Sequence, residues 1–202
     1  ISVLFDVHES SFLAGYLSVY VNENLDKLFD TASYQFNLDE ATKRNIGFIG
    51  GTASEGIQVF SYGFMEGIST AAGELGVKYN YTSKYDAGFG DAAVGTSFTD
   101  SCYTAGANIV YAVAGNVGTG VTSKAADAKR LAIEVDANKD AVRPGNILTS
   151  VMKNTNVPVK AISEAYKNNK LADLGNVIYY NLDSGATGIT DLATISKSIK
   201  AD

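Results

Sequence analysis

One stretch near the middle of the chain, residues 108–136, constrains the fold more than any other. It reads NIVYAVAGNVGTGVTSKAADAKRLAIEVD, and its apolar run IVYAVA has no polar alternation, which is typical of a strand buried on both faces of a parallel sheet. The run stops at Gly115, and Gly118 and Gly120 favour a tight turn into a helix whose first N–H groups would point toward a ligand above the sheet. A second strand, 131–135, then delivers Asp136 at its C-terminal tip.

This strand–turn–helix–strand unit has more than one interpretation. A carboxylate such as that of Asp136 can accept two hydroxyl hydrogen bonds from a sugar, so the unit fits a small-ligand cleft. A dinucleotide site also has a glycine turn and a later acid, but its usual spacing is G-x-G-x-x-G, whereas this chain has G-x-x-G-x-G. The glycines are also compatible with a turn that serves structure alone.

Charge and composition exclude several function classes. The 202 residues carry a net charge of −6 and show no cluster of Lys or Arg, which argues against nucleic acid and anionic membrane surfaces as partners. Cys102 and His8 are single residues of their type, and the His8–Glu9 pair lacks the second histidine of a zinc protease. We therefore expect no metal, no cofactor and no hydrolytic chemistry.

The ends of the chain and its hydropathy complete this picture. No run of about 18 apolar residues occurs, so the sequence predicts no membrane span. The first residues, ISVLFDV, lack the features of a signal peptide and already look like a buried strand. We expect this start to be a boundary within a longer protein.

The pattern from residue 45 to 136 alternates strands and helices, which predicts a parallel sheet with helices on both faces. Outside that region the polar stretch 23–44 is typical of a solvated insertion. The expected strands are 1–7, 45–50, 77–81, 109–114, 131–135, 146–152 and 177–181. The expected helices are 10–22, 39–44, 54–76, 91–105, one after Gly118, 157–168 and 191–200, with a loop at 182–188.

Several segments in succession resemble one protein family. They are ESSFLAGYLSVYV, NIGFIGGTASEGIQVFSYGFMEGI, YAVAGNVGTGV, IEVDANKD, ILTSVMKN and YYNLDSGATGITD. This order is similar to that of the basic membrane protein family of bacterial lipoproteins, which includes purine nucleoside receptors of ABC transporters. The similarity covers most of the chain.

The resemblance implies a type I periplasmic-binding-protein fold, an α/β architecture with two lobes and a ligand between them. Residues 1–22 and 146–173 are then expected in a first lobe that lacks its N-terminal part. Residues 23–44 would form an insertion and crossing, and residues 45–143 and 177–202 a second lobe. In this arrangement 1–7 and 146–152 should be neighbouring strands in a small first lobe.

The resemblance also implies site residues. Asp136 corresponds to the aspartate that binds ribose, and Gly115 and Gly118 to the turn against which the ligand lies. Tyr111 is the nearest match to an aromatic that stacks on the base, although a core tyrosine is an equal alternative. Lys153 matches a lysine that serves either the ligand or a hinge ion pair. Asp183 stands where the family often has a lysine, so the contact to the base edge would have changed sign.

The expected function is therefore a solute-binding receptor of an ABC importer that binds a nucleoside without chemistry. Its implied partners are the small-molecule ligand and an ABC permease. Its implied location is the extracytoplasmic face of a bacterial membrane, held by a lipid anchor outside this chain. Two alternatives stay open: an oxidoreductase with a nucleotide cofactor, for which one histidine is a poor supply of proton donors, and a surface lipoprotein antigen with vestigial binding.

Overall fold

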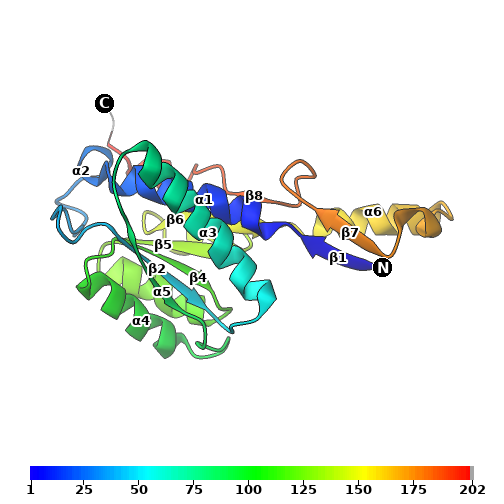
Figure 1. The fold of residues 1–202 in the computed structure, drawn as a ribbon, viewed down its shortest axis with the longest axis horizontal. Coiled ribbons are helices and arrows are strands. Elements are labelled where there is room, and N and C mark those ends of the chain that lie inside the picture. Colours follow the sequence, from blue (N-terminus) through cyan, green and yellow to red (C-terminus); the bar gives the residue numbers. More distant parts are fainter. Residues whose placement is uncertain (201–202) are drawn as a thin grey trace.

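The computed structural model describes residues 1–200 and consists of a large sheet between helices, with a small two-stranded sheet at one end (Figure 1). The strands are β1 (Ser2–Phe5), β2 (Asn45–Gly50), β3 (Asn80–Lys84), β4 (Ile109–Val113), β5 (Leu131–Asp136), β6 (Ile147–Lys153), β7 (Val177–Tyr180) and β8 (Thr187–Ile189). The helices are α1 (Val7–Asn22), α2 (Leu25–Leu28), α3 (Glu55–Glu74), α4 (Ala92–Thr104), α5 (Val117–Asp127) and α6 (Asn156–Lys167). Short 3-10 segments are Asp140–Val142, Leu171–Leu174 and Ile195–Ser198.

The large sheet has the strand order β3-β2-β4-β5-β6-β8. Neighbours from β3 to β6 pair in parallel, and β8 joins the edge antiparallel to β6. This confirms the prediction that residues 45–136 form one parallel sheet. The chain runs from β2 outward to β3 and then returns past β2 to β4, so the direction of winding reverses between β2 and β4.

Helices cover both faces of this sheet (Figure 1). On one face α1 and α3 pack over a core that includes Phe48, Phe64 and Tyr111. On the other face α4 and α5 enclose a second cluster with Cys102 and Val121. Every residue of β2 and β4 is buried, as a strand with helices on both faces requires.

The backbones of α1 and α3 touch because glycines line their contact. A Cβ atom at Gly15 would clash with the carbonyl oxygen of Phe64 on α3. Atoms added at Gly63 and Gly67 would clash in the same way with carbonyl oxygens on α1. The glycines of α3 therefore serve a close contact with another helix rather than with the sheet.

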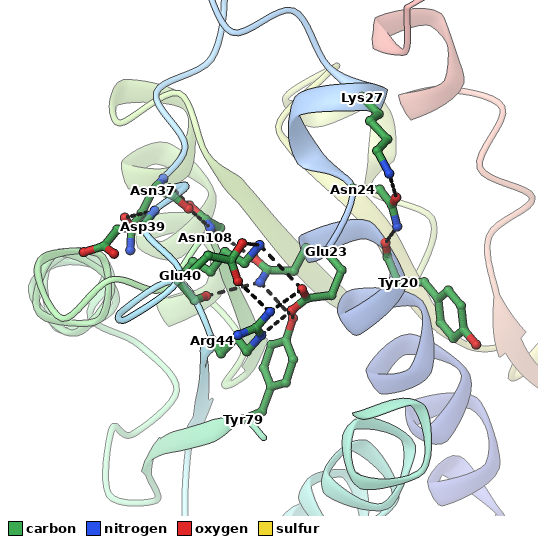
Figure 2. A network of polar contacts seen from close by, with 12 residues as sticks. Tyr20, Glu23, Asn24, Lys27, Asn37, Asp39, Glu40, Arg44, Tyr79 and Asn108 are labelled. Carbon is green, nitrogen blue, oxygen red and sulfur yellow. Dashed lines mark hydrogen bonds and ion pairs between the residues drawn. The ribbon is translucent and has the colours of Figure 1, made fainter. Parts of the chain in front are cut away.

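A network of charged and polar side chains ties α1 to the starts of β2 and β3 (Figure 2). The Glu23 carboxylate accepts hydrogen bonds from Nε and Nη2 of Arg44, both at 2.9 Å, and from the Tyr79 hydroxyl at 2.6 Å. Lys43 lies 3.5 Å from the same carboxylate. Burial raises the pKa of Glu23, but the bonds from Arg44 and Tyr79 and the charge of Lys43 outweigh it and lower this pKa to about 2.

The stretch 23–44 is mostly exposed, as expected of a surface excursion, but a few of its side chains anchor it to the core. Phe29 is fully buried, and the Tyr34 ring stacks on Phe36 at a centroid distance of 4.9 Å. Further along the stretch, the backbone oxygen of Asn37 accepts a hydrogen bond from the buried Asn108 amide at 2.9 Å (Figure 2). The burial of these aromatics could not be predicted from the sequence, because they lie in a polar stretch and do not recur with a helix or strand period.

The expected pairing of 1–7 with 146–152 is wrong. β6 pairs with β5 inside the large sheet, and β1 pairs in parallel with β7, Ser2 opposite Val177. Figure 1 shows β1, β7 and α6 together at one end of the molecule, whereas α1 lies over the large sheet. Residues 7–22 and 147–153 therefore accompany the segments expected in the second lobe, and 177–180 accompanies β1. A buried apolar strand carries no local signal of which parallel sheet it joins.

Smaller corrections concern weakly periodic segments. β3 occupies Asn80–Lys84 rather than 77–81, because its pairing with β2 begins at Asn80. The expected helix 39–44 is a series of turns, and the expected helix 191–200 contains only the 3-10 segment Ile195–Ser198. The expected loop 182–188 includes most of β8. In the described residues no helix is long and apolar enough to cross a bilayer.

The helix contact predicts opposite effects of alanine at two glycines of α3. Gly67→Ala should lower the free energy of unfolding by about 1–3 kcal/mol, because the added methyl pushes α3 off the α1 backbone. Gly73→Ala should raise it by about 0.5–1 kcal/mol, because nothing lies within 4 Å of the added atom and alanine favours the helix. Urea unfolding measures both, and equal effects would contradict the contact.

The Glu23 network predicts a pH-dependent stability. Glu23→Gln should destabilise the fold by about 1–3 kcal/mol at neutral pH, because Arg44 and Lys43 lose their shared carboxylate. Since the folded pKa of Glu23 lies near 2, below its ordinary value of 4.5, this contribution is complete above about pH 4.5 and is lost as the pH falls toward 2. Denaturant unfolding at several pH values should show the difference from wild type shrinking over that range.

Glu164→Gln on α6 serves as a control, because this carboxylate is exposed. It should change stability little at any pH. A Glu23→Gln variant whose deficit stays constant from pH 7 to pH 2.5 would argue against the lowered pKa.

Candidate functional site

A cleft of about 370 Å³ opens at the C-terminal ends of the parallel strands. It lies where the winding reverses between β2 and β4, the position at which ligands bind in open parallel sheets. Its lining comes from the segment after β2, the loop before α4, and the tips of β4, β5 and β6. The lining residues are Ser54, Gly56, Ile57, Phe60, Phe89, Val113, Ala114, Gly115, Val135, Asp136 and Lys153.

Asp136 ends β5, at the strand tip where the sequence predicted it, and lines the cleft. Its side chain is exposed, and within the described residues its carboxylate has no hydrogen bond or ion pair to another side chain. Its φ of 73° is unusual for a residue other than glycine, and the Ala137 N–H donates to the Val135 carbonyl at 3.0 Å across it. The backbone therefore turns sharply at Asp136.

Gly115 also lines the cleft, in a turn that only glycine adopts easily, with a φ of 55°. The next residue, Asn116, donates its N–H to the Phe89 carbonyl at 2.8 Å, which fixes the loop before α4 beside the tip of β4. The Phe89 ring lies against Gly51, where a Cβ would overlap it, and the residue is 49% exposed. An exposed aromatic ring thus lies in the cleft.

Phe89 is a site residue that the sequence analysis missed. It lies in KYDAGFGD, a loop before α4 in which no helix or strand period identifies a site residue. A signal was present, because an aromatic between two glycines outside any helix or strand pattern is a poor core residue.

Tyr111 does not reach the cleft. Its ring is fully buried, 4.9 Å from the ring centre of Phe64, and its hydroxyl is 3.3 Å from that of Ser11 on α1. Of the two alternatives, the structure favours the core tyrosine. The reason is strand alternation, because Tyr111 is in the middle of β4 and faces α1 and α3, whereas only residues at the strand tip face the cleft.

Gly118 does not line the cleft either. A Cβ atom there would lie 3.1 Å from the carboxylate of Glu134, which is only 3% exposed and is paired with Lys139 at 2.9 Å. Burial raises the pKa of Glu134, and the bond from Lys139 opposes this rise. The first N–H groups of α5, which the sequence predicted to face a ligand, donate instead to carbonyls of residues 114–116.

Lys153 lines the cleft, and its ammonium lies 5.3 Å from the ring centre of Phe5 on β1. This contact joins the end of the large sheet to the two-stranded sheet, and the predicted alternative of a hinge ion pair finds no partner among the described residues. Asp183 lies on an exposed turn after β7 and is not part of the cleft lining.

A larger hollow, about 640 Å³, lies between α1, α3 and Leu182. Its walls are mostly apolar, with Phe12, Leu13 and Tyr62 among them, and it contains none of the predicted ligand residues. Within residues 1–200 no three His, Cys, Asp or Glu side chains come together as metal ligands. The cleft at the strand tips is therefore the candidate site.

Comparison with known structures supports the architecture. A solute-binding protein of an ABC transporter system from Aeropyrum pernix K1 superposes with a TM-score of 0.79 at 20% identity, over 94% of this chain and 49% of that one. A solute-binding protein from Conexibacter woesei gives a TM-score of 0.67 at 15% identity, over 99% and 57%. At these identities the likeness establishes the fold alone, that of periplasmic solute-binding proteins.

Comparison with sequences gives the family. Basic membrane protein B of Borrelia garinii subsp. bavariensis is 27% identical over 95% of this chain and 50% of its own length. The ABC transporter nucleoside-binding protein BmpA of Lactococcus lactis subsp. cremoris is 31% identical over 74% of this chain and 46% of its own. The chain thus spans about half the length of the curated relatives it matches.

The family's sequence model matches residues 1–201, almost the whole chain, and its description is that of a PnrA-like ABC transporter substrate-binding protein. The fold, the cleft at the reversal point and this match agree with one another. The chain belongs to the Bmp family of PnrA-like ABC transporter substrate-binding proteins.

Proposed function

We propose that this chain forms the ligand-holding part of a solute receptor for an ABC importer, that the ligand is a nucleoside, and that the receptor performs no chemistry. The observation that carries the proposal is that two exposed groups, the Asp136 carboxylate and the Phe89 ring, line the same cleft. A sugar diol and a flat base are the two chemical parts of a nucleoside, and these groups match them.

The carboxylate of Asp136 is suited to the sugar. Two acceptor oxygens match the two hydroxyls of a ribose, and each charge-assisted bond contributes roughly 1.5–3 kcal/mol when sheltered from water. Asp136 has no competing side-chain partner among residues 1–200, so binding breaks no existing bond to another side chain. Gly115, beside it, leaves room for the ligand to approach the backbone.

The ring of Phe89 is suited to the base. Aromatic side chains stack on any nucleobase, and Phe89 presents its ring in the cleft on a support of Gly51. Lys153 adds a cation at the side of the cleft that faces β1, where it can donate to an acceptor on the ligand. The relative from Lactococcus named as nucleoside-binding supports the same ligand class.

A dinucleotide cofactor fits less well. The pyrophosphate of such a cofactor needs free N–H groups at a helix N-terminus. At the start of α5 these groups are already bonded, and the buried Glu134 carboxylate lies beside Gly118. A phosphate there would meet a like charge, so we do not favour the oxidoreductase alternative.

The rest of the proposal concerns the whole protein. The partner would be an ABC permease, and the receptor would act on the extracytoplasmic face of a bacterial membrane, held by a lipid anchor. Support comes from the family, whose members are substrate-binding proteins of ABC transporters. A vestigial surface antigen would differ by binding no nucleoside at all.

The carboxylate predicts a sugar-dependent loss of binding. Asp136→Asn should weaken nucleoside affinity of the full-length protein by roughly 10- to 1000-fold, because the amide has only one acceptor oxygen and no charge. Isothermal titration with inosine, adenosine and their 2′-deoxy forms measures this. The deoxy forms should bind wild type more weakly and lose little more on the variant. Equal binding of ribo- and deoxynucleosides by wild type would contradict the sugar contact.

The ring predicts a base-dependent loss. Phe89→Leu should weaken nucleoside binding by roughly 5- to 100-fold, because leucine fills space without stacking, and Phe89→Tyr should bind as wild type. Tyr62→Leu, which removes an exposed aromatic of α3 outside the cleft, is the matched control. Equal affinities for Phe89→Leu and Tyr62→Leu in the same titration would show that Phe89 does not touch the base.

A further inference from the structure

We propose that Glu134, Lys139, Ser150 and Asp140 form a latch that holds the backbone of Asp136 in its turned conformation and so aims the carboxylate into the cleft. In this proposal Glu134 and Lys139 are positioning residues, which act on a ligand only through Asp136. The mechanical part stands on the geometry of the loop, and the ligand part rests on the proposed function.

The turn at Asp136 is a strained conformation. A φ of 73° combined with a hydrogen bond from the Ala137 N–H to the Val135 carbonyl defines a three-residue γ-turn of the rare, positive-φ kind. Such a backbone persists at a residue other than glycine only where the surroundings enforce it, and strain of this kind gathers at functional sites. Something near Asp136 must therefore oppose its relaxation.

The ion pair between Glu134 and Lys139 brackets the turn. Glu134 precedes Asp136 by two residues in β5 and Lys139 follows it by three, and their side chains meet at 2.9 Å. Glu134 is 3% exposed, so the pair is sheltered from solvent on its acidic side. The ion pair holds the two ends of residues 134–139 together. The backbone between them must therefore turn sharply near its middle.

Ser150 on β6 holds the part of the loop that follows Asp136. Its Oγ accepts a hydrogen bond from the Lys139 N–H at 3.0 Å and donates one to Oδ1 of Asp140 at 2.6 Å. Ser150 is fully buried and lies opposite Glu134 in the register of β5 and β6. Both ends of the loop are thus bound to the same place in the sheet, and the turn is held only while the Glu134–Lys139 ion pair and these bonds act together.

The consequence for binding is preorganisation. A carboxylate on a free loop would have to give up alternative positions when a ligand arrives, whereas a held carboxylate has already done so. None of the four latch residues is in the cleft lining. The latch can therefore affect affinity only by fixing the position of Asp136.

The first test needs no ligand. We compare the wild-type chain with a latch-free variant, Glu134→Gln with Lys139→Met, which removes both charges without leaving one buried and unpaired. Asp136→Gly is then added to each. In the wild-type background glycine should raise the melting temperature by roughly 1–3 °C, because it relieves the strain. In the latch-free background it should give no rise, because the turn has relaxed. A fall in the first background, or equal shifts in both, would overturn the latch.

The second test measures affinity for inosine and adenosine by titration of the full-length protein. The latch-free variant should bind roughly tenfold or more weakly, a loss that Lys139→Arg, which keeps the pair, should not show. Lys84→Met is the matched control, since Lys84 pairs with Asp86 at 2.7 Å and its side chain is 35% exposed, like that of Lys139. Unchanged affinity in the latch-free variant, together with a loss for Asp136→Asn, would overturn the latch and leave the proposed function standing.

If wild type binds no nucleoside, the proposed function fails, and the first test alone decides whether the latch exists. A rise on Asp136→Gly confined to the wild-type background would then retain the latch for a ligand of another class.

Discussion

Parallel pairing of β2, β4, β5 and β6 is the interaction on which the rest of the molecule depends. Strands that pair in this way need connections that return from one end of the sheet to the other, which here are α3, α4, α5 and the loop before β6. β2 and β4 are buried along their whole length. Burial on both faces requires that polar groups inside the sheet have partners, as Glu134 and Ser150 do, so polar groups open to a ligand lie at the strand tips. The cleft lies at those tips because the winding reverses there and the connecting helices diverge.

The two ends of the sheet differ in how their polar groups are used. At the N-terminal ends Glu23, Arg44 and Tyr79 satisfy one another, and the pKa of the carboxylate is lowered accordingly (Figure 2). At the C-terminal ends Asp136 is exposed and has no such partners among the described residues. Groups that satisfy one another stabilise a fold, whereas a group held without partners is ready to bind a ligand. The same residue types therefore perform different work at opposite edges.

The strained backbone at Asp136 links the fold to this function. Its φ of 73° is maintained next to an ion pair whose carboxylate is buried and next to a buried serine. Glycines elsewhere solve a different problem. Gly15, Gly63 and Gly67 let two helix backbones approach, and Gly51 leaves space for the Phe89 ring. The close contact between the two helices and the space for the Phe89 ring thus both depend on glycines. The spacing of these glycines in the sequence shows little periodicity.

The sequence by itself determined the alternation of strands and helices from 45 to 136, the parallel sheet, the family, and the position of Asp136 at a strand tip, because these follow from local periodicity and from motif order. Only the tertiary structure decided that β6 joins β5, that β1 joins β7, and that Tyr111 is buried while Phe89 is exposed. Those outcomes depend on contacts between residues far apart in the chain, where many pairings have similar local patterns. The local pattern of a single sequence does not select one of these pairings. The packing of the whole sheet does select one.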